Sequence, residues 1–378
     1  MFRTLTILLI FCLNLFSQVD THINGYLQNM QTVWSAKNGG SLILSNSANN
    51  RINLTLYYND LSFTGSIRNI FDYGEFVELV PGYNDLALED NGYLNLTKEI
   101  TSGDSYLLYS NIDRISLTYT YKNLELQIGR QRINWGINYV WTPNDIFNSA
   151  SFINFDYAEK PGSDAVRAQY YFDYASSLEV VAKIDNQEKT TMAGKFQFNY
   201  WDYDFQLISG YSSSDIMFGG GWSGSISGAG FSGELTYFGD RSEANDRKNI
   251  LVGSVGSNYM FENSLFLSFE FLYNSIGIVG KSKGITDIFN LDYSAKNLSP
   301  SRYSIFGQIQ YPFTPLLNGS VATIVNPTDG SLFLSPTLEI SLNQDVYLLG
   351  TGQFFIGENR TEWGAFGQFY YIRIKWNF

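Results

Sequence analysis

The feature that most constrains this chain is an alternation of apolar and polar residues that recurs along nearly its whole length. Successive side chains of a β-strand point to opposite faces, so a period of two residues predicts strands. The clearest example is the C-terminal stretch, in which more polar residues separate Tyr370, Ile372, Ile374, Trp376 and Phe378. The sequence therefore predicts an all-β protein.

Composition distinguishes between two kinds of fold that have this alternation. The apolar face of each strand either forms the core of a soluble sandwich or faces lipid around a barrel with a polar lumen. The chain is 44% hydrophobic and 17% aromatic but only 16% charged, with a mean hydropathy of -0.13. Soluble domains carry roughly 25% charge, whereas aromatic girdles mark both edges of a membrane barrel. The prediction is therefore a transmembrane antiparallel up-and-down β-barrel.

The N-terminus predicts export. Arg3 precedes an apolar stretch at 5–16, which is too short to cross a bilayer as a helix. We therefore expect residues 1–17 to be a signal peptide and residues 18–378 to form a single barrel domain. The one cysteine, Cys12, lies in the predicted leader, so the mature chain is expected to have no thiol or disulfide chemistry.

The C-terminus predicts a destination. An aromatic last residue, Phe378, that closes an alternating strand resembles the signal that the outer-membrane assembly machinery reads. We expect Tyr370, Ile372, Ile374 and Trp376 to belong to the same signal. The predicted location is the outer membrane of a Gram-negative cell, with its lipids, lipopolysaccharide and assembly machinery as partners.

The alternation divides into eighteen strands, with sixteen as the alternative because the first three strands and the fifteenth are the weakest. An even count is expected for a barrel with short periplasmic turns and long extracellular loops. The predicted strands span 24–35, 51–59, 61–70, 112–121, 124–133, 164–173, 177–186, 190–200, 203–212, 215–226, 229–239, 248–260, 264–276, 302–311, 318–325, 331–341, 346–356 and 365–378. Short connections alternate with longer ones, which supports this division.

A barrel of this size is wide enough for a water-filled channel. The polar positions of the strands are then expected to line the lumen, and opposite charges placed there tune selectivity. The predicted inward charged residues are Arg114, Glu125, Arg167, Asp173, Glu179, Lys183, Lys195, Glu234, Glu270 and Glu339.

One strand has a phase problem. Leu126 and Ile128 are expected to face lipid, so strict alternation would place Arg130 and Arg132 there too. Charged groups on the lipid face near the midplane cost roughly 2–4 kcal/mol each. A bulge at Gly129 would turn both arginines inward and the following Ile133 and Trp135 outward; the alternative places both arginines at the outer rim.

Three segments that follow carry a family resemblance. They are GRQRINWG at 129–136, PNDIFN at 143–148 and KPGSDAVR at 160–167. Together they resemble porin-like outer-membrane proteins related to alginate-export and carbohydrate-selective porins. The family often has proline where this chain has Ser149, which implies a looser turn. The resemblance implies a channel whose third outer loop, about 134–163, folds into or over the lumen.

The residues of this third loop support the same idea. A loop of roughly 30 residues is usually functional or disordered, and its many aromatic residues argue against disorder. We expect arginine–carboxylate pairs to anchor it to the inner wall. The candidate pore residues are Arg114, Arg130, Arg132, Arg167, Lys183, Lys195, Trp135, Tyr139, Trp141, Asp145, Asp156 and Asp164. Two interpretations stay open: purely structural anchoring, or contact with a passing solute.

Other features narrow the remaining functions. The net charge of -12 disfavours nucleic-acid binding, and the single His22 leaves thiol, serine–histidine and histidine–metal catalysis without candidates. An acidic second loop, about 71–111, is either a solvated surface or a binding site for divalent cations. We expect no enzyme activity, cofactor or metal. The favoured function is a channel for small hydrophilic solutes, saccharides or anions; the alternatives are a closed scaffold for export or surface assembly and a surface adhesin.

Overall fold

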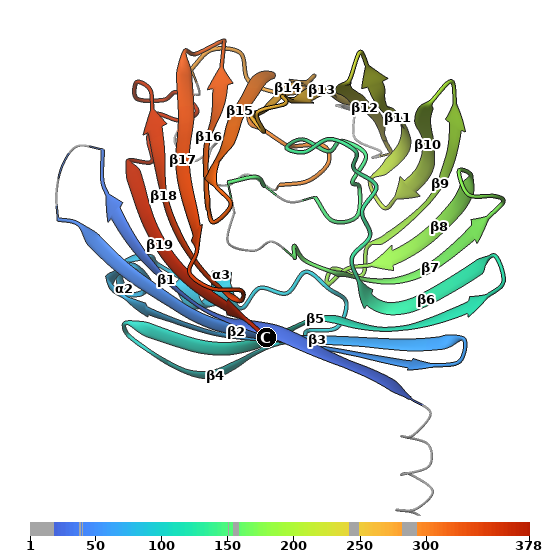
Figure 1. Cartoon of the computed structure of the whole chain (residues 1–378), viewed down its shortest axis with the longest axis horizontal. Helices are drawn as coiled ribbons and strands as arrows, with labels where there is room; N and C mark the ends of the chain where they lie inside the picture. Colours follow the sequence, from blue (N-terminus) through green and yellow to red (C-terminus); the bar gives the residue numbers. More distant parts are fainter. Residues whose placement is uncertain are drawn as a thin grey trace, which may run out of the picture.

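The computed structural model describes residues 19–37, 39, 41–149, 151–153, 159–241, 249–281 and 293–378. Their strands form one sheet that closes on itself when β1 pairs with β19 (Figure 1). The elements are β1 (Asp20–Ser35), β2 (Ile43–Tyr58), β3 (Leu61–Gly74), α2 (Glu75–Leu79), α3 (Tyr83–Ala87), β4 (Thr97–Gly103), β5 (Tyr106–Tyr121), β6 (Leu124–Gln131), β7 (Ser163–Tyr171), β8 (Ser177–Ile184), β9 (Thr190–Tyr200), β10 (Tyr203–Ser212), β11 (Asp215–Ile226), β12 (Ala229–Asp240), β13 (Ile250–Met260), β14 (Phe266–Asn274), β15 (Tyr303–Thr314), β16 (Leu317–Asn326), β17 (Ser331–Ser341), β18 (Val346–Ile356) and β19 (Gln368–Asn377).

The ring has eighteen strands, because β4 pairs only with β5 and β3 pairs directly with β5. Every neighbouring pair in the ring is antiparallel, so the chain runs up and down around the barrel. The predicted eighteen-stranded barrel is confirmed, and the sixteen-stranded alternative is wrong. In the described part of the chain, no helix is both long and apolar enough to cross a membrane.

The outer surface of the barrel is apolar. Along β19 the exposed and half-buried positions alternate, and Ile372 is 60% exposed on the outer face. Ile128 and Leu207 are also exposed there, each by 57%. Large apolar side chains that would be costly in water are therefore presented outward in period two, as lipid contact requires. The outward direction of these side chains excludes the alternative in which the apolar faces form the core of a soluble sandwich.

The two rims differ as predicted. Tight connections, such as those at 59–60, 122–123 and 201–202, gather at one rim, which we call the turn rim. The opposite rim, called the loop rim, carries the long connections, and the barrel is closed at the turn rim by the two main-chain hydrogen bonds between Gly25 and Phe378, of 2.9 and 3.0 Å.

Two predicted boundaries are wrong near the N-terminus. β2 begins at Ile43 instead of residue 51, so the first loop is short. The predicted second loop is largely structured, because β3 and β5 extend into it and β4 adds a strand beside β5. The polar residues of these segments hide the alternation, since asparagine occupies outward as well as inward positions of β2.

Candidate functional site

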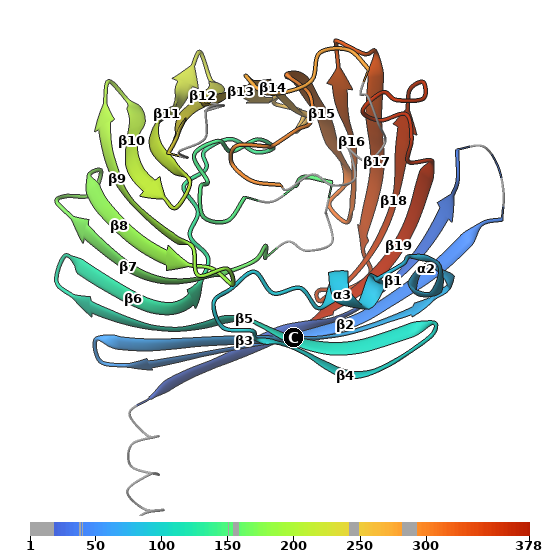
Figure 2. The ribbon, with the colours of Figure 1, turned by 180° about the vertical axis from the view of Figure 1, so that it is seen from behind.

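The described parts of the connection between β6 and β7, at 132–149, 151–153 and 159–162, run inside the ring of strands, and so does the chain that follows α3 (Figures 1 and 2). We call these two segments the third loop and the second loop. Both enter from the loop rim. That the third loop as a whole folds into or over the lumen stays a prediction, because residues 150 and 154–158 lie outside the described residues.

Two buried carboxylates of the barrel wall hold the main chain of the third loop. Glu270 on β14 accepts hydrogen bonds from the amide nitrogens of Tyr139 at 2.7 Å, Val140 at 2.9 Å and Trp141 at 3.1 Å. Its side chain is only 2% exposed. A carboxylate that accepts several N–H groups compensates for its own burial and orders the peptide that donates them.

Glu234 on β12 does the same for the residues on either side of this segment. Its Oε1 accepts from the amides of Ile137 at 2.5 Å and Asn138 at 2.6 Å, and its Oε2 accepts from the amide of Asn144 at 2.9 Å. The sequence predicted Glu234 and Glu270 as lumen residues but not this role. Anchoring is therefore carried largely by wall carboxylates and loop amides, in addition to arginine–carboxylate pairs.

The aromatic residues of the third loop divide between packing and the lumen. Trp141 is buried against β13–β15, where its ring lies 6.5 Å from that of Phe306. Trp135 is 1% exposed and packs edge-on against Phe147 at 4.9 Å. Tyr139 is 60% exposed. Of the three predicted aromatics, only Tyr139 therefore offers an open ring face.

The predicted bulge at Gly129 is only partly correct. The pairing of β6 with β5 runs through Gly129 without a register shift. Instead, Gly129 has a φ of 117°, a conformation that favours glycine, and a Cβ there would lie 2.2 Å from the carbonyl oxygen of Ile115. Arg130 turns inward as predicted, but Ile133 and Trp135 are both buried inside the barrel, so the prediction that they face lipid is wrong.

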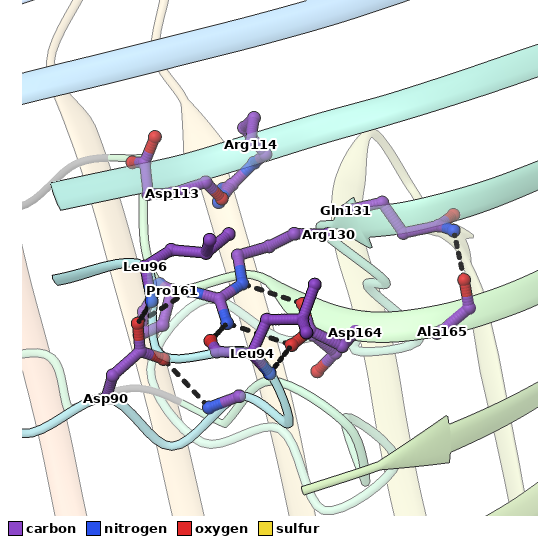
Figure 3. Close-up of polar contacts among 12 residues, drawn as sticks. Asp90, Leu94, Leu96, Asp113, Arg114, Arg130, Gln131, Pro161, Asp164 and Ala165 are labelled. Carbon is purple, nitrogen blue, oxygen red and sulfur yellow. Dashed lines mark hydrogen bonds and ion pairs between the residues drawn. The ribbon is translucent and has the colours of Figure 1, made fainter. Parts of the chain in front are cut away.

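Arg130 is the centre of a buried ionic cluster (Figure 3). Its Nε donates to Asp164 Oδ1 at 2.7 Å, and its Nη1 donates to Asp90 Oδ2 at 2.8 Å. A further bond reaches the carbonyl oxygen of Leu94. Asp164 lies opposite Arg130 on β7, whereas Asp90 and Leu94 belong to the second loop. Arg130 therefore ties the second loop to the barrel wall.

The second loop approaches this cluster very closely. A Cβ built at Gly92 would lie 1.8 Å from Arg130 Nη2, so any larger residue there would displace the Arg130 guanidinium from its carboxylate partners. The Asp90 carboxylate also accepts from the amides of Gly92 at 2.9 Å and Leu96 at 2.8 Å. Nothing in the sequence separates Asp90 from the other acids of its loop, because its partner is 40 residues away.

The end of the third loop is held by two other predicted arginines. Arg114 on β5 donates to the carbonyl oxygens of Glu159 and Lys160, both at 2.7 Å. Arg132 lies 4.0 Å from the buried Asp145 carboxylate. Burial raises the pKa of Asp145 to about 6, against the opposing effect of Arg132. Asp156, also predicted, lies outside the described residues.

Four other predicted charges, Arg167, Glu125, Glu179 and Lys195, pair on the wall itself, whereas Asp173 lies in the turn after β7. Arg167 on β7 donates to Glu179 at 2.8 Å and to Glu125 at 3.1 Å, and Lys195 lies 3.2 Å from Glu179. Lys183 donates to the carbonyl oxygen of Phe147 at 2.9 Å. Cations and anions therefore alternate on adjacent strands β6 to β9, and they do not form two separate arrays.

Two further residues that the sequence did not single out form a buried pair. Arg51 on β2 and Asp113 on β5 are ion-paired, with side chains 5% and 3% exposed. Among the described residues, no group of three or more acidic, histidine or cysteine side chains is placed to hold a metal ion, the acidic second loop included.

Comparison with solved structures identifies similar barrels. OccAB1 of Acinetobacter baumannii superposes with a TM-score of 0.60 and 12% identity over 95% of this chain and 96% of its own. OprD of Pseudomonas aeruginosa gives 0.58 and 8% over 95% of each chain. OccD3 of the same organism gives 0.58 and 9%, covering 95% of this chain and 91% of its own. Similarity at this identity shows a shared fold: the chain has a porin-type barrel.

The sequence itself matches no protein-family model and no curated protein. The structural neighbours carry no support for a particular relationship to alginate-export or carbohydrate-selective porins, so that part of the resemblance stays a prediction.

Proposed function

We propose that this chain is an outer-membrane channel for passive diffusion of small hydrophilic solutes. The observation that carries the proposal is a closed barrel with an apolar outer face and a charged, hydrogen-bonded inner wall that holds two loops inside the lumen. Loops fixed by a rigid wall narrow a lumen and define what passes it. The similarity to porin barrels is consistent with this function.

Pairing of the lumen charges bears on the solute. The cations Arg51, Arg130 and Arg167 each have a carboxylate partner, so they supply little net positive field. Neutral solutes, saccharides among them, therefore fit the wall better than anions do. Tyr139, with its open ring face, is the residue that we assign to solute contact, since an aromatic face suits a sugar ring.

Assembly and location belong to the same proposal. Outward-facing Tyr370, Ile372, Ile374, Trp376 and Phe378 form the predicted assembly signal, and each is between 41% and 60% exposed. We assign them to recognition by the barrel-assembly machinery and then to contact with outer-membrane lipid. Residues 1–17, the proposed signal peptide, lie outside the described residues.

The experiment is conductance of the purified full-length protein in planar bilayers. A channel gives stepwise current increases. Arg132→Ala and Arg167→Ala are expected to change ion selectivity, because they remove the cationic partners of Asp145 and Glu125. The dense packing of Trp141 and its neighbours against β13–β15 favours one alternative, a closed barrel that acts as a scaffold. Zero conductance at saturating insertion would establish that alternative.

A further inference from the structure

A cavity of about 260 Å³ lies inside the barrel beneath the loop rim. Three connections of that rim enclose it: the third loop, the segment before β15, and the connection from β18 to β19. An apolar cavity of about 150 Å³ is enough to bind benzene. This one therefore has room for a single ring with a short substituent.

The walls of the cavity are rich in aromatic rings. Trp141 and Phe152 of the third loop, Tyr293, and Trp363 and Phe366 of the last connection all line it. Trp363 is held from behind by Phe333, at 5.8 Å between ring centroids, and by Phe355 at 6.1 Å. Rings fixed in this way present rigid faces to whatever fills the cavity.

One acid lines this aromatic cavity, and it has no cationic partner among the described residues. Glu362 is 4% exposed, and its carboxylate oxygens accept from the hydroxyls of Ser299 at 3.1 Å and Ser301 at 2.5 Å. A second acid, Asp329, accepts from the Glu362 amide at 2.7 Å and adds a like charge. Burial, together with the smaller effect of the nearby Asp329, raises the pKa of Glu362 to about 7.

This arrangement differs from the other buried acids of the barrel. Asp113, Asp164 and Glu179 each lie against an arginine, and Glu270 is compensated by three main-chain amides. Glu362 has only neutral donors, the two serine hydroxyls and the side chain of Asn326. A buried carboxylate without a counter-charge is costly, and a cation from outside would relieve that cost.

A second polar atom at the cavity also lacks a partner. The indole Nε1 of Trp363 is buried and makes no hydrogen bond within the described structure. A buried N–H of this kind is satisfied by a ligand or an ordered solvent molecule. An oxygen acceptor on the ligand would meet this need.

We propose that the cavity binds an organic ammonium ion that carries an aromatic ring, with Glu362 as its counter-ion and the rings of Trp141, Trp363 and Phe366 as its walls. Cations are attracted to the faces of aromatic rings, most strongly to tryptophan. The phenol oxygen of a ligand such as tyramine supplies the acceptor for Trp363 Nε1. This inference deepens the proposed channel function. Any effect of the bound ammonium ion on transport rests on that function, whereas binding itself does not.

The test is isothermal titration calorimetry on the purified full-length protein in micelles at pH 8, where the Glu362 carboxyl is ionised. Tyramine is compared with tyrosol, which has a hydroxyl in place of the ammonium group. We expect saturable binding of tyramine and at least tenfold weaker binding of tyrosol. Equal affinities for the two compounds, or no tyramine binding at millimolar concentration, would overturn the proposal without any variant.

Variants then locate the site. Glu362→Gln keeps an acceptor for the serine hydroxyls but removes the charge, so tyramine affinity is expected to fall at least tenfold. Glu358→Gln is the matched control in the same connection, because Glu358 is exposed and pairs with Lys281. Equal binding by wild type and Glu362→Gln would refute the assignment.

Conductance separates this inference from the proposed function. Tyramine binding by a protein that forms no channel would leave the site in place and remove the channel. Stepwise conductance without tyramine binding would support the channel and refute the binding site.

Discussion

Replacing Glu270 by alanine should release the third loop from the barrel wall. The substitution leaves the amides of Tyr139, Val140 and Trp141 without their acceptor. An unsatisfied buried donor costs about 1–3 kcal/mol, so three of them cost about 3–9 kcal/mol. Water in the lumen would reach the freed amides, which favours the lower end of about 3 kcal/mol.

Hydrogen exchange measures this loss directly. Since 1.4 kcal/mol corresponds to a tenfold change in an equilibrium constant, about 3 kcal/mol corresponds to roughly 100-fold faster exchange of the loop amides. Channel current should become larger and noisier at the same time. The exchange rate of Glu270→Gln should lie between those of the wild type and Glu270→Ala, because its amide keeps one acceptor oxygen but places an NH2 group near the loop donors.

Glu339→Ala is the matched control. Glu339 is also a wall carboxylate, on β17, but it pairs with Arg373 at 3.7 Å and accepts no amide of the third loop. It should leave exchange at 137–144 unchanged. If Glu270→Ala also exchanges at the wild-type rate in this segment, the carboxylate does not hold the loop and the reasoning is wrong.

Three further outcomes are expected. Arg130→Ala leaves Asp90 and Asp164 buried without a cation, so the free energy of unfolding in micelles should fall by about 3–5 kcal/mol, while Arg241→Ala at an exposed site should not change the denaturation midpoint. Deleting Phe378 removes both bonds to Gly25 and the proposed assembly signal, so less protein should reach the outer-membrane fraction, and Phe378→Tyr should restore it; equal amounts would contradict this. Because burial raises the pKa of Asp145 to about 6 and that of Glu362 to about 7, both acids become protonated as the pH falls from 8 to 5, and cation selectivity measured from reversal potentials should decrease with it. The double variant Asp145→Asn, Glu362→Gln should show a flatter pH profile over that range.

Nearly every barrel strand could be located from the sequence, because lipid-facing apolar residues and lumen-facing polar residues alternate along it. Strands from β9 to β12 and β17 to β18 begin and end within a residue of their predicted limits. It failed where the outward positions are themselves polar, as in β2, and where a segment of regular structure is attached to the rim, as β4 is. In both places the backbone forms a strand, but apolar and polar side chains do not alternate clearly along it.

The candidate site was less predictable. Arg130, Arg132 and Arg167 were recognised as inward charges, but their partners were not, because Asp90 and Arg130 are brought together only by the path of the second loop. Trp135 was expected to face lipid and is instead buried inside, since a positive φ at Gly129, with no shift of register, turns the chain.

From the residues alone came the all-β class, the favoured division into eighteen strands and the outward face of most strands. Those properties follow from local alternation, which each strand expresses independently of the others. The filling of the lumen is set by the folded chain. Folding determines which carboxylates hold the loops, which charges pair, and that Glu362 lies beside an aromatic cavity. These depend on contacts between segments far apart in the chain, and residue spacing does not encode such contacts.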